Sequence, residues 1–420
     1  MQFRKHLSHK QSTRSLRATI LTLTFVDIFS YAAISPFFAL LILDTPYSIT
    51  QQVVISKHFL LGALFSLFAS LQVLFLPLWG HFSLFFGKRK ALILVNIFSC
   101  FTYFISAVAV WYSWVWLLFV ATGLAGMTSA NAVLSHACLA TEVTSKEESA
   151  HHYSSVGSVI GFAFLIAPCI TRLLLYKYPN TQAPIFIYLF CSLSSLLNAH
   201  ICAYYLPRQL DQTAKPSPKH IPSTRRTSWQ YFNRHLSVEF CCFCGWYTFL
   251  KFFQVVLIEN AYIDPEDSII GLSFLGFSCT FWQGVRVVMT PHGQLWYQSA
   301  LSLSLATMIF CVLAMVFTTN TAILAGVVFI IGWAYSTMMP NIYSQWMEYS
   351  SLQDEVKSGV FQSCQAFAKV ISPLIAGLAA GQASYMPSLF AALCFCTALL
   401  ILSKKTLSTQ HSTTSYFKAK

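Results

Sequence analysis

The sequence predicts an all-α membrane protein with twelve transmembrane helices arranged as two bundles of six. Three observations support this fold class: the composition, the spacing of the apolar segments and the placement of basic residues. Of the 420 residues, 56% are apolar and 10% are charged, whereas a soluble domain carries roughly 25% charged residues. This composition excludes a soluble enzyme, a coiled coil, a disordered regulator and a secreted disulfide scaffold.

Twelve segments are long and apolar enough to cross a bilayer, which takes about 20 residues each. They cover about 18–43, 53–79, 91–110, 114–138, 155–176, 184–206, 237–258, 269–289, 295–317, 321–343, 357–380 and 384–403. The first follows a basic stretch, as a signal peptide would. It lacks a small-residue cleavage site and is longer than a signal h-region, so we expect a retained helix.

The longest polar stretch, Pro207–His235, divides the spans six and six. It holds four prolines and six Lys or Arg residues, which is the composition of a linker. The predicted organisation is a tail at 1–17, a bundle at 18–206, a linker at 207–236, a second bundle at 237–403 and a tail at 404–420. Two six-helix bundles joined in this way are typical of transporters with internal repeats.

The basic residues predict the orientation. With both termini in the cytoplasm, 21 Lys and Arg residues fall on the cytoplasmic side, and the outer side holds two, Arg172 and Lys177. The net charge of +12 therefore reflects short loops rather than a nucleic-acid-binding patch. With no targeting signal recognised, we expect a bacterial inner membrane, and a monomer.

The 13 cysteines lie almost entirely within apolar segments. The cluster Cys241, Cys242 and Cys244 has no second Cys or His pair at ligand spacing. We interpret these thiols as small buried apolar groups, with a metal or redox site as the alternative. No cofactor, metal or disulfide is expected.

Ionisable residues inside spans are costly, at about 2.5–3.5 kcal/mol on insertion scales, and so tend to mark a pathway. They are Asp27, Lys57, His58, Glu239, Lys251, Arg286 and Lys369. Asp27 lies about 13 Å into the first span, near the midplane. We predict a proton-binding or counter-charge role for it, with a structural hydrogen-bond network as the alternative.

Two further groups extend this pathway. Gln254 lies one turn beyond Lys251, and Gln362, Gln365 and Lys369 form one polar stripe on an otherwise apolar helix. Such a stripe must face protein or water, as a cavity lining or as contacts between helices. Asn131 is a further polar candidate in the fourth span.

Near the cytoplasmic ends, Glu239 and Arg286 suit structural or gating pairs. Lys57 and His58 lie near an outer end, where snorkelling explains them.

Several motifs resemble those of one transporter family. The segment "TEVTSKEE" at Thr141–Glu148 precedes a glycine-rich span. It is similar to the "A-D-x-T-x-x-E-E-R" loop of the major facilitator superfamily. The positions in register are Glu142, Thr144, Glu147, Glu148, Gly157, Gly161 and Pro168. Gly80, Gly87, Lys88, Arg89 and Lys90 likewise resemble the family's loop after the second span, with Leu84 and Phe85 at the positions of its acid and arginine.

Asp27 and Pro36 keep the spacing found in the drug and metabolite–proton antiporter-like branch. The arginine that proton-coupled drug antiporters carry in the fourth span is missing. The resemblance implies two rocking bundles, and gating roles for Lys88, Arg89 and Glu142.

The chain contains no Walker A motif, so an ion gradient or the solute's own gradient is the expected driving force. Lys251 and Lys369 outnumber the single deep acid Asp27. We therefore expect a small anionic or zwitterionic solute, such as a carboxylate, an amino acid or a siderophore, with proton coupling as one alternative. Import and export both stay open.

Two other functions are possible on the sequence. One is a transport-fold sensor or scaffold without net transport, which the basic linker and the altered loop motif favour. The other is a membrane enzyme acting on lipid, for which His151 and His152 beside Glu147 and Glu148 are the one candidate cluster. The family motif already accounts for that loop, so we expect no enzyme.

Overall fold

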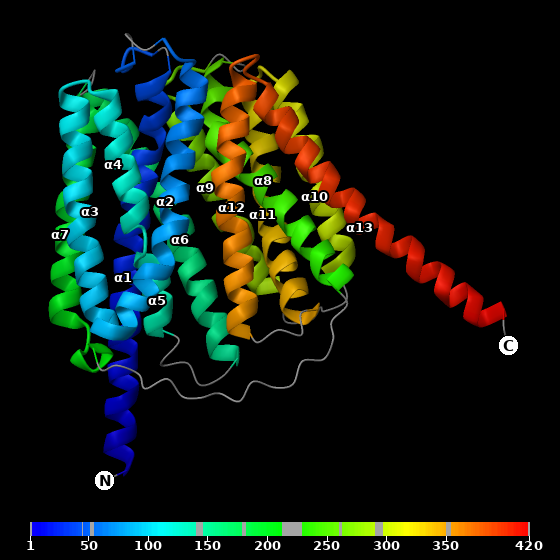
Figure 1. The fold of residues 1–420 in the computed structure, drawn as a ribbon, viewed down its shortest axis with the longest axis horizontal. Coiled ribbons are helices and arrows are strands. Elements are labelled where there is room, and N and C mark those ends of the chain that lie inside the picture. Colours follow the sequence, from blue (N-terminus) through cyan, green and yellow to red (C-terminus); the bar gives the residue numbers. More distant parts are fainter. Residues whose placement is uncertain are drawn as a thin grey trace. The chain divides into compact units, whose positions relative to one another are not determined.

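A computed structural model describes residues 2–43, 45–50, 54–139, 146–178, 182–211, 229–259, 263–289, 297–349 and 354–418. The helices are α1 (Gln2–Ile42), α2 (Lys57–Phe86), α3 (Lys88–Trp111), α4 (Val115–Thr128), α5 (Asn131–Leu139), α6 (Lys146–Lys177), α7 (Gln182–Tyr205), the 3₁₀ turn η1 (Arg208–Asp211), α8 (Trp229–Glu259), α9 (Ser268–Met289), α10 (Tyr297–Phe317), α11 (Thr321–Tyr349), α12 (Asp354–Ala380) and α13 (Met386–Lys418). Figure 1 shows their arrangement.

Twelve candidate membrane spans occur in the structure, each at one of the predicted segments. The described residues form helices and connecting turns without strands. The predicted fold class, an all-α protein with twelve spans, is therefore confirmed, and the chain is a multi-pass integral membrane protein.

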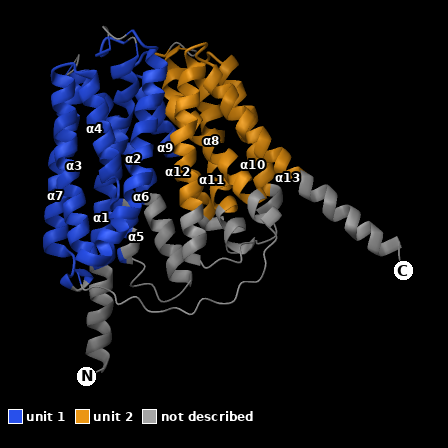
Figure 2. Ribbon diagram, viewed as in Figure 1, with its two compact units in different colours: residues 1–220, 264–277 blue, residues 221–263, 278–420 orange. Residues whose placement is uncertain are grey.

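The chain forms two compact units (Figure 2). Unit 1 comprises Met1–His220 and Asp264–Phe277, and unit 2 comprises Ile221–Ile263 and Ser278–Lys420. Helix α9 is shared, because its first ten residues belong to unit 1 and the rest to unit 2. The predicted second bundle, 237–403, assigned this whole helix to the second half.

Within unit 1, α3 packs along α7, α1 along α6, and α2 along α4. Gly126 permits the last of these contacts, since a Cβ atom there would collide with the backbone oxygen of Phe68. In unit 2, α8 packs against α12 and α13, and α10 against α11 and α13. Gly332 on α11 has an equally close neighbour in Ser278 of α9. Small residues thus bring the helix backbones together, as expected in a membrane.

Helices α3, α7, α10 and α13 expose large apolar side chains, among them Phe101, Leu193, Phe310 and Leu393. No described charged residue lies between Ala91 and Trp111 of α3 or between Tyr297 and Phe317 of α10. Apolar surface of this extent suits contact with lipid rather than water. The charged residues of the spans are carried by other helices, as the sequence predicted.

The fourth span is not one continuous helix. Helix α4 ends at Thr128 and α5 begins at Asn131, so the chain leaves the helical path at Ser129 and Ala130. Two side chains of α2 bond to the break: Trp79 Nε1 donates to the carbonyl of Met127 at 2.7 Å, and Gln72 Nε2 donates to Ser129 Oγ at 3.0 Å. Partners of this kind are what make a helix break tolerable within a membrane.

Candidate functional site

Asp27 of α1 is held in a hydrogen-bond network within unit 1. Asn131 Nδ2 donates to Asp27 Oδ1 at 2.7 Å, and Asn96 Nδ2 donates to Asn131 Oδ1 at 2.9 Å. Asn96 also donates to the carbonyl of Leu92 at 2.8 Å. The carboxylate of α1 is therefore bonded to α5, and α3 is linked to it through Asn131. Asn131 was a candidate from the sequence, whereas Asn96 was missed because an asparagine in an apolar span has many possible partners.

The break in the fourth span positions this network. Asn131 is the first residue of α5, directly after the break. A half-helix that begins inside the membrane presents its first amide groups, and their partial positive charge, at that depth. Asp27 therefore lies beside the amide donor of Asn131 at the start of a half-helix.

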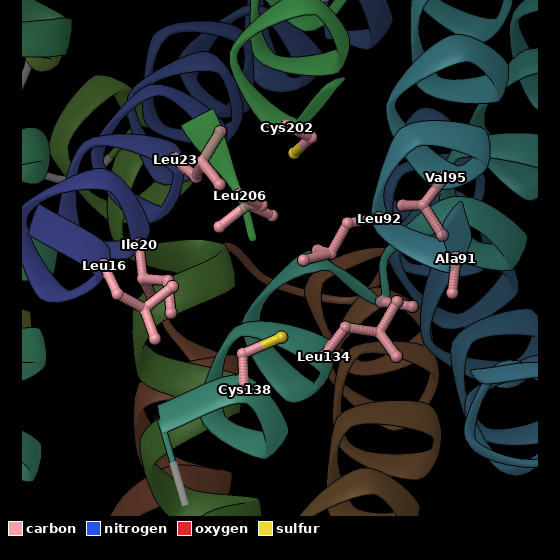
Figure 3. Close-up of a cluster of buried hydrophobic side chains, with 11 residues drawn as sticks. Leu16, Ile20, Leu23, Ala91, Leu92, Val95, Leu134, Cys138, Cys202 and Leu206 are labelled. Carbon is pink, nitrogen blue, oxygen red and sulfur yellow. The ribbon is translucent and has the colours of Figure 1, made fainter. Parts of the chain in front are cut away.

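An apolar cluster of unit 1 includes residues from the same helices, α1, α3 and α5 (Figure 3). Leu23 lies one turn before Asp27, Leu92 one turn before Asn96, and Leu134 one turn after Asn131. The full cluster is Leu16, Ile20, Leu23, Ala91, Leu92, Val95, Ala130, Leu134, Cys138, Cys202 and Leu206. Its members are at most 4% exposed, so they form a buried core within unit 1.

In unit 2, Lys369 of α12 lies over an aromatic ring. Its Nζ atom is 5.2 Å from the ring centroid of Tyr247 on α8, a cation–π geometry. Lys251 lies one turn beyond Tyr247 on α8. Gln254 follows on the same helix and is 5% exposed. Two cations on neighbouring helices thus share one region of unit 2.

The predicted polar stripe on α12 ends at Lys369, the residue that lies over Tyr247. Gln362 is exposed, and Gln365 and Lys369 are partly buried. An aromatic pair joins α8 to α11: the rings of Trp246 and Tyr335 stack 3.9 Å apart at 19°. The sequence did not single out this pair, because 16% of the chain is aromatic.

Arg286 of α9 binds the backbone of α11. Its Nη1 atom donates to the carbonyls of Ser336 at 2.7 Å and Thr337 at 3.1 Å. Pro340 explains why a donor is needed, because a proline has no N–H for the carbonyl four residues earlier, which is that of Ser336. The guanidinium group therefore binds the carbonyl that Pro340 leaves without a helical donor, a contact that the gating hypothesis for Arg286 did not include.

Glu239 of α8 is 0% exposed. Neither carboxyl oxygen has a hydrogen-bond partner among the described residues. The sequence suggested a structural or gating pair for Glu239, and no described side chain forms that pair.

The loop after α2 is clamped within unit 1. Arg89 forms an ion pair with Asp211 of η1 at 3.3 Å. It also donates to the carbonyls of Cys202 at 3.3 Å and of Ala203, near the end of α7. A basic side chain at the end of a helix binds the carbonyls left without helical partners. Lys88 lies beside Arg89 and is partly buried.

Gly87 is required at the turn between α2 and α3. Its φ of +94° disfavours other residues, and a Cβ atom would collide with the backbone of Asp211. Asp211 Oδ1 accepts a hydrogen bond from the backbone N–H of Lys90, at the start of α3. Asp211, which lies in the predicted linker, was not a candidate. Glu142, the remaining gating candidate, lies outside the described residues.

A second polar cluster lies in unit 1 at the predicted outer side. Arg172 of α6 pairs with Glu266 at 2.7 Å and with Asp267 at 3.0 Å. The hydroxyl of Tyr47, in the loop after α1, donates a short hydrogen bond to Glu266. Burial and the neighbouring Glu266 carboxylate raise the pKa of Tyr47 well above its usual range. The sequence shows an acidic loop at Glu259–Ser268 on the predicted outer side, but it does not identify Arg172 as the partner of that loop.

Comparisons with known proteins place these features in context. The sequence is 32% identical over 109 residues to the class E tetracycline resistance protein of Escherichia coli, covering 26% of each chain. It is 26% identical over 113 residues to the class H tetracycline resistance protein of Pasteurella multocida, covering 27% of each chain. The chain therefore spans about a quarter of the length of these relatives.

Solved transporter structures share the fold over nearly the whole chain. The human organic anion transporter MFSD10 superposes with a TM-score of 0.64 at 15% identity, covering 93% of this chain and 99% of that one. The peptide-family transporter PepTSo gives 0.70 at 10% identity, covering 94% and 98%. Residues 20–373 match the family model described as Major Facilitator Superfamily. The chain belongs to the major facilitator superfamily.

Proposed function

We propose that this protein is a secondary transporter that moves a small anionic or zwitterionic organic solute across a bacterial inner membrane by alternating access. Its family and its structural neighbours are transporters rather than enzymes. The proposal further assigns both termini to the cytoplasm, a monomer as the transporting unit, and protons as the coupling ion.

The observation that carries the solute class is the pair of lysines in unit 2. Lys369 lies over the ring of Tyr247, and Lys251 follows one turn later on the same helix as Tyr247. Two cationic side chains at one level of a membrane protein attract an anionic group, since charges held apart from bulk water interact strongly. A carboxylate on the solute is the partner that we propose for them.

Asp27 supplies the single deep negative charge of the proposed pathway. Its bond to Asn131 holds the carboxylate in one orientation, which suits a fixed counter-charge for the amine of a zwitterion. The proposed pathway consists of Asp27, Lys251, Gln254, Gln362, Gln365 and Lys369. The proposed gating residues are Glu239, Arg286, Lys88, Arg89 and Glu142.

Solute flux into proteoliposomes tests this proposal. The panel contains carboxylates, amino acids, neutral sugars and tetracycline, each with and without an imposed pH gradient. We expect flux of anionic or zwitterionic members and a tenfold or greater loss in Lys369→Met. Lys177→Met is the matched control, since Lys177 also lies over a tyrosine ring, 5.5 Å from the centroid of Tyr178, at the end of α6.

Equal flux of neutral and anionic solutes, or unchanged selectivity in Lys369→Met, contradicts the proposed solute class. Absence of flux for every solute, combined with binding of one of them, would favour the sensor function instead.

A further inference from the structure

Glu239 is the one acidic side chain of the described spans that is fully buried without a partner. The inference below rests on the proposed function, since it concerns how that transport is coupled. Glu239 is 0% exposed, and both of its carboxyl oxygens lack a hydrogen-bond partner among the described residues. Asp27 differs, because it accepts a 2.7 Å bond from Asn131.

Among the side chains that the structure describes, the titratable groups nearest Glu239 are a histidine and cysteines. On α8 itself, His235 lies one turn before it and Cys242 one turn after it. Helix α12 contributes Cys364, whose thiol contacts the carbonyl of Leu236 at 3.8 Å. Helix α13 contributes Cys394, beside Cys242.

The nearest described arginine along α8 is already engaged. Arg234 donates to the carbonyls of Ile401 at 3.0 Å and Leu402 at 3.0 Å, near the end of the apolar part of α13. Its guanidinium group therefore serves the backbone of α13 rather than the Glu239 carboxyl group.

A charged carboxylate is strongly disfavoured where neither water nor a donor can reach it. A neutral carboxylic acid is tolerated there, since only a weak dipole is buried. The environment of Glu239 in this conformation therefore selects the protonated form.

We propose that Glu239 is the proton-binding site of the transport cycle. In the conformation seen here the side chain is a neutral acid. When α8 shifts against α12 and water reaches the carboxyl group, the O–H bond breaks, the proton passes to water and the carboxylate remains. Rebinding of a proton restores the buried state.

The position of Glu239 suits such an exchange. It lies five residues after Arg234, where the span begins, or about 7.5 Å along the helix. His235 lies between it and that end, on the same helix face. A small opening at the end of the α8–α12 contact would expose the carboxyl group without unfolding either helix.

Infrared difference spectroscopy tests the proposal without any solute. The purified full-length protein is titrated from about pH 5 to pH 9, where an ordinary glutamate is already ionised. We expect a carboxylic C=O band in the wild type that is absent in Glu239→Gln. The band should persist in Glu259→Gln, the same change at the other end of α8. Glu239→Asp should keep a shifted band, which controls for altered folding.

A wild-type spectrum that matches Glu239→Gln across this range would overturn the proposal, whether or not the protein transports any solute. Proteoliposomes then test coupling. We expect Glu239→Gln to lose accumulation driven by a pH gradient, and Glu259→Gln to keep it. Gradient-driven accumulation that survives in Glu239→Gln also refutes the proposal. Failure of the wild type to transport any panel solute, with the infrared band present, rejects the proposed function and leaves the proton site intact.

Discussion

The bond between Asn131 and Asp27 gives the sharpest energetic prediction. Replacing Asn131 by leucine removes the 2.7 Å bond to the carboxylate and the 2.9 Å bond from Asn96. A hydrogen bond to a charged group contributes about 1.5–3 kcal/mol, and a neutral bond between membrane helices about 0.6 kcal/mol. Asn131→Leu should therefore lower the free energy of unfolding by about 2–4 kcal/mol.

A double-mutant cycle separates the charged from the neutral contribution. In Asp27→Asn the acceptor keeps its shape but loses its charge, so the bond from Asn131 falls to about 0.6 kcal/mol. The cost of Asn131→Leu should then be smaller by about 1–2.4 kcal/mol in the Asp27→Asn background than in the wild type. This difference measures whether Asp27 is charged in the folded protein.

The assay is equilibrium unfolding in mixed micelles with a denaturing detergent at neutral pH. Asn198→Leu is the matched control, since Asn198 Nδ2 donates to the carbonyl of Leu23 at 3.3 Å and does not bond to Asp27. Its cost should be the same in both backgrounds. If Asn131→Leu also costs the same in both, the carboxylate is not charged and the assignment of Asp27 as a counter-charge is wrong.

Three further predictions concern packing and pH. Arg286→Met should lower the free energy of unfolding by about 1.5–3 kcal/mol by leaving the Ser336 carbonyl of α11 without its donor, and Pro340→Ala, which restores a helical N–H, should recover part of that loss in detergent unfolding. Gly126→Ala should lower the thermal midpoint because its Cβ would meet the α2 backbone, whereas Gly80→Ala, with open space around it, should not. Since the pKa of Tyr47 is raised in the folded state, the unfolded chain loses this proton first, so stability is fully present below about pH 10 and falls as the pH rises above it. Tyr47→Phe should flatten that fall, and an unchanged alkaline slope in the variant would contradict the reasoning.

The sequence located most of the charged residues that matter. A charge within an apolar span is costly wherever the helix packs, so such residues are recognisable from hydropathy alone. They are Asp27, Glu239, Lys251, Arg286 and Lys369. Their partners are not recognisable in the same way, because a charge does not indicate which neighbour will satisfy it. Glu239 is an example: its sequence position suggests a charged pair, but neither carboxyl oxygen has a hydrogen-bond partner among the described residues.

The break at Ser129 and Ala130 marks a second limit of the sequence. Neither residue is glycine or proline, and the surrounding segment reads as one apolar span. What stabilises the break comes from α2, through Trp79 and Gln72. Only the packing of the second span on the fourth supplies those donors, and pattern reading within one span cannot reveal them.

The sequence by itself determined the class of protein, the number of spans, their limits to within a few residues and the family. These follow from hydropathy and charge, which add up along the chain and do not depend on distant contacts. Only the tertiary structure shows that Asn131 donates to Asp27, that Arg286 binds the backbone of α11 and that Lys369 lies over the ring of Tyr247. Asp27 and Asn131 are 104 positions apart, and their bond exists only because helix packing brings those positions together.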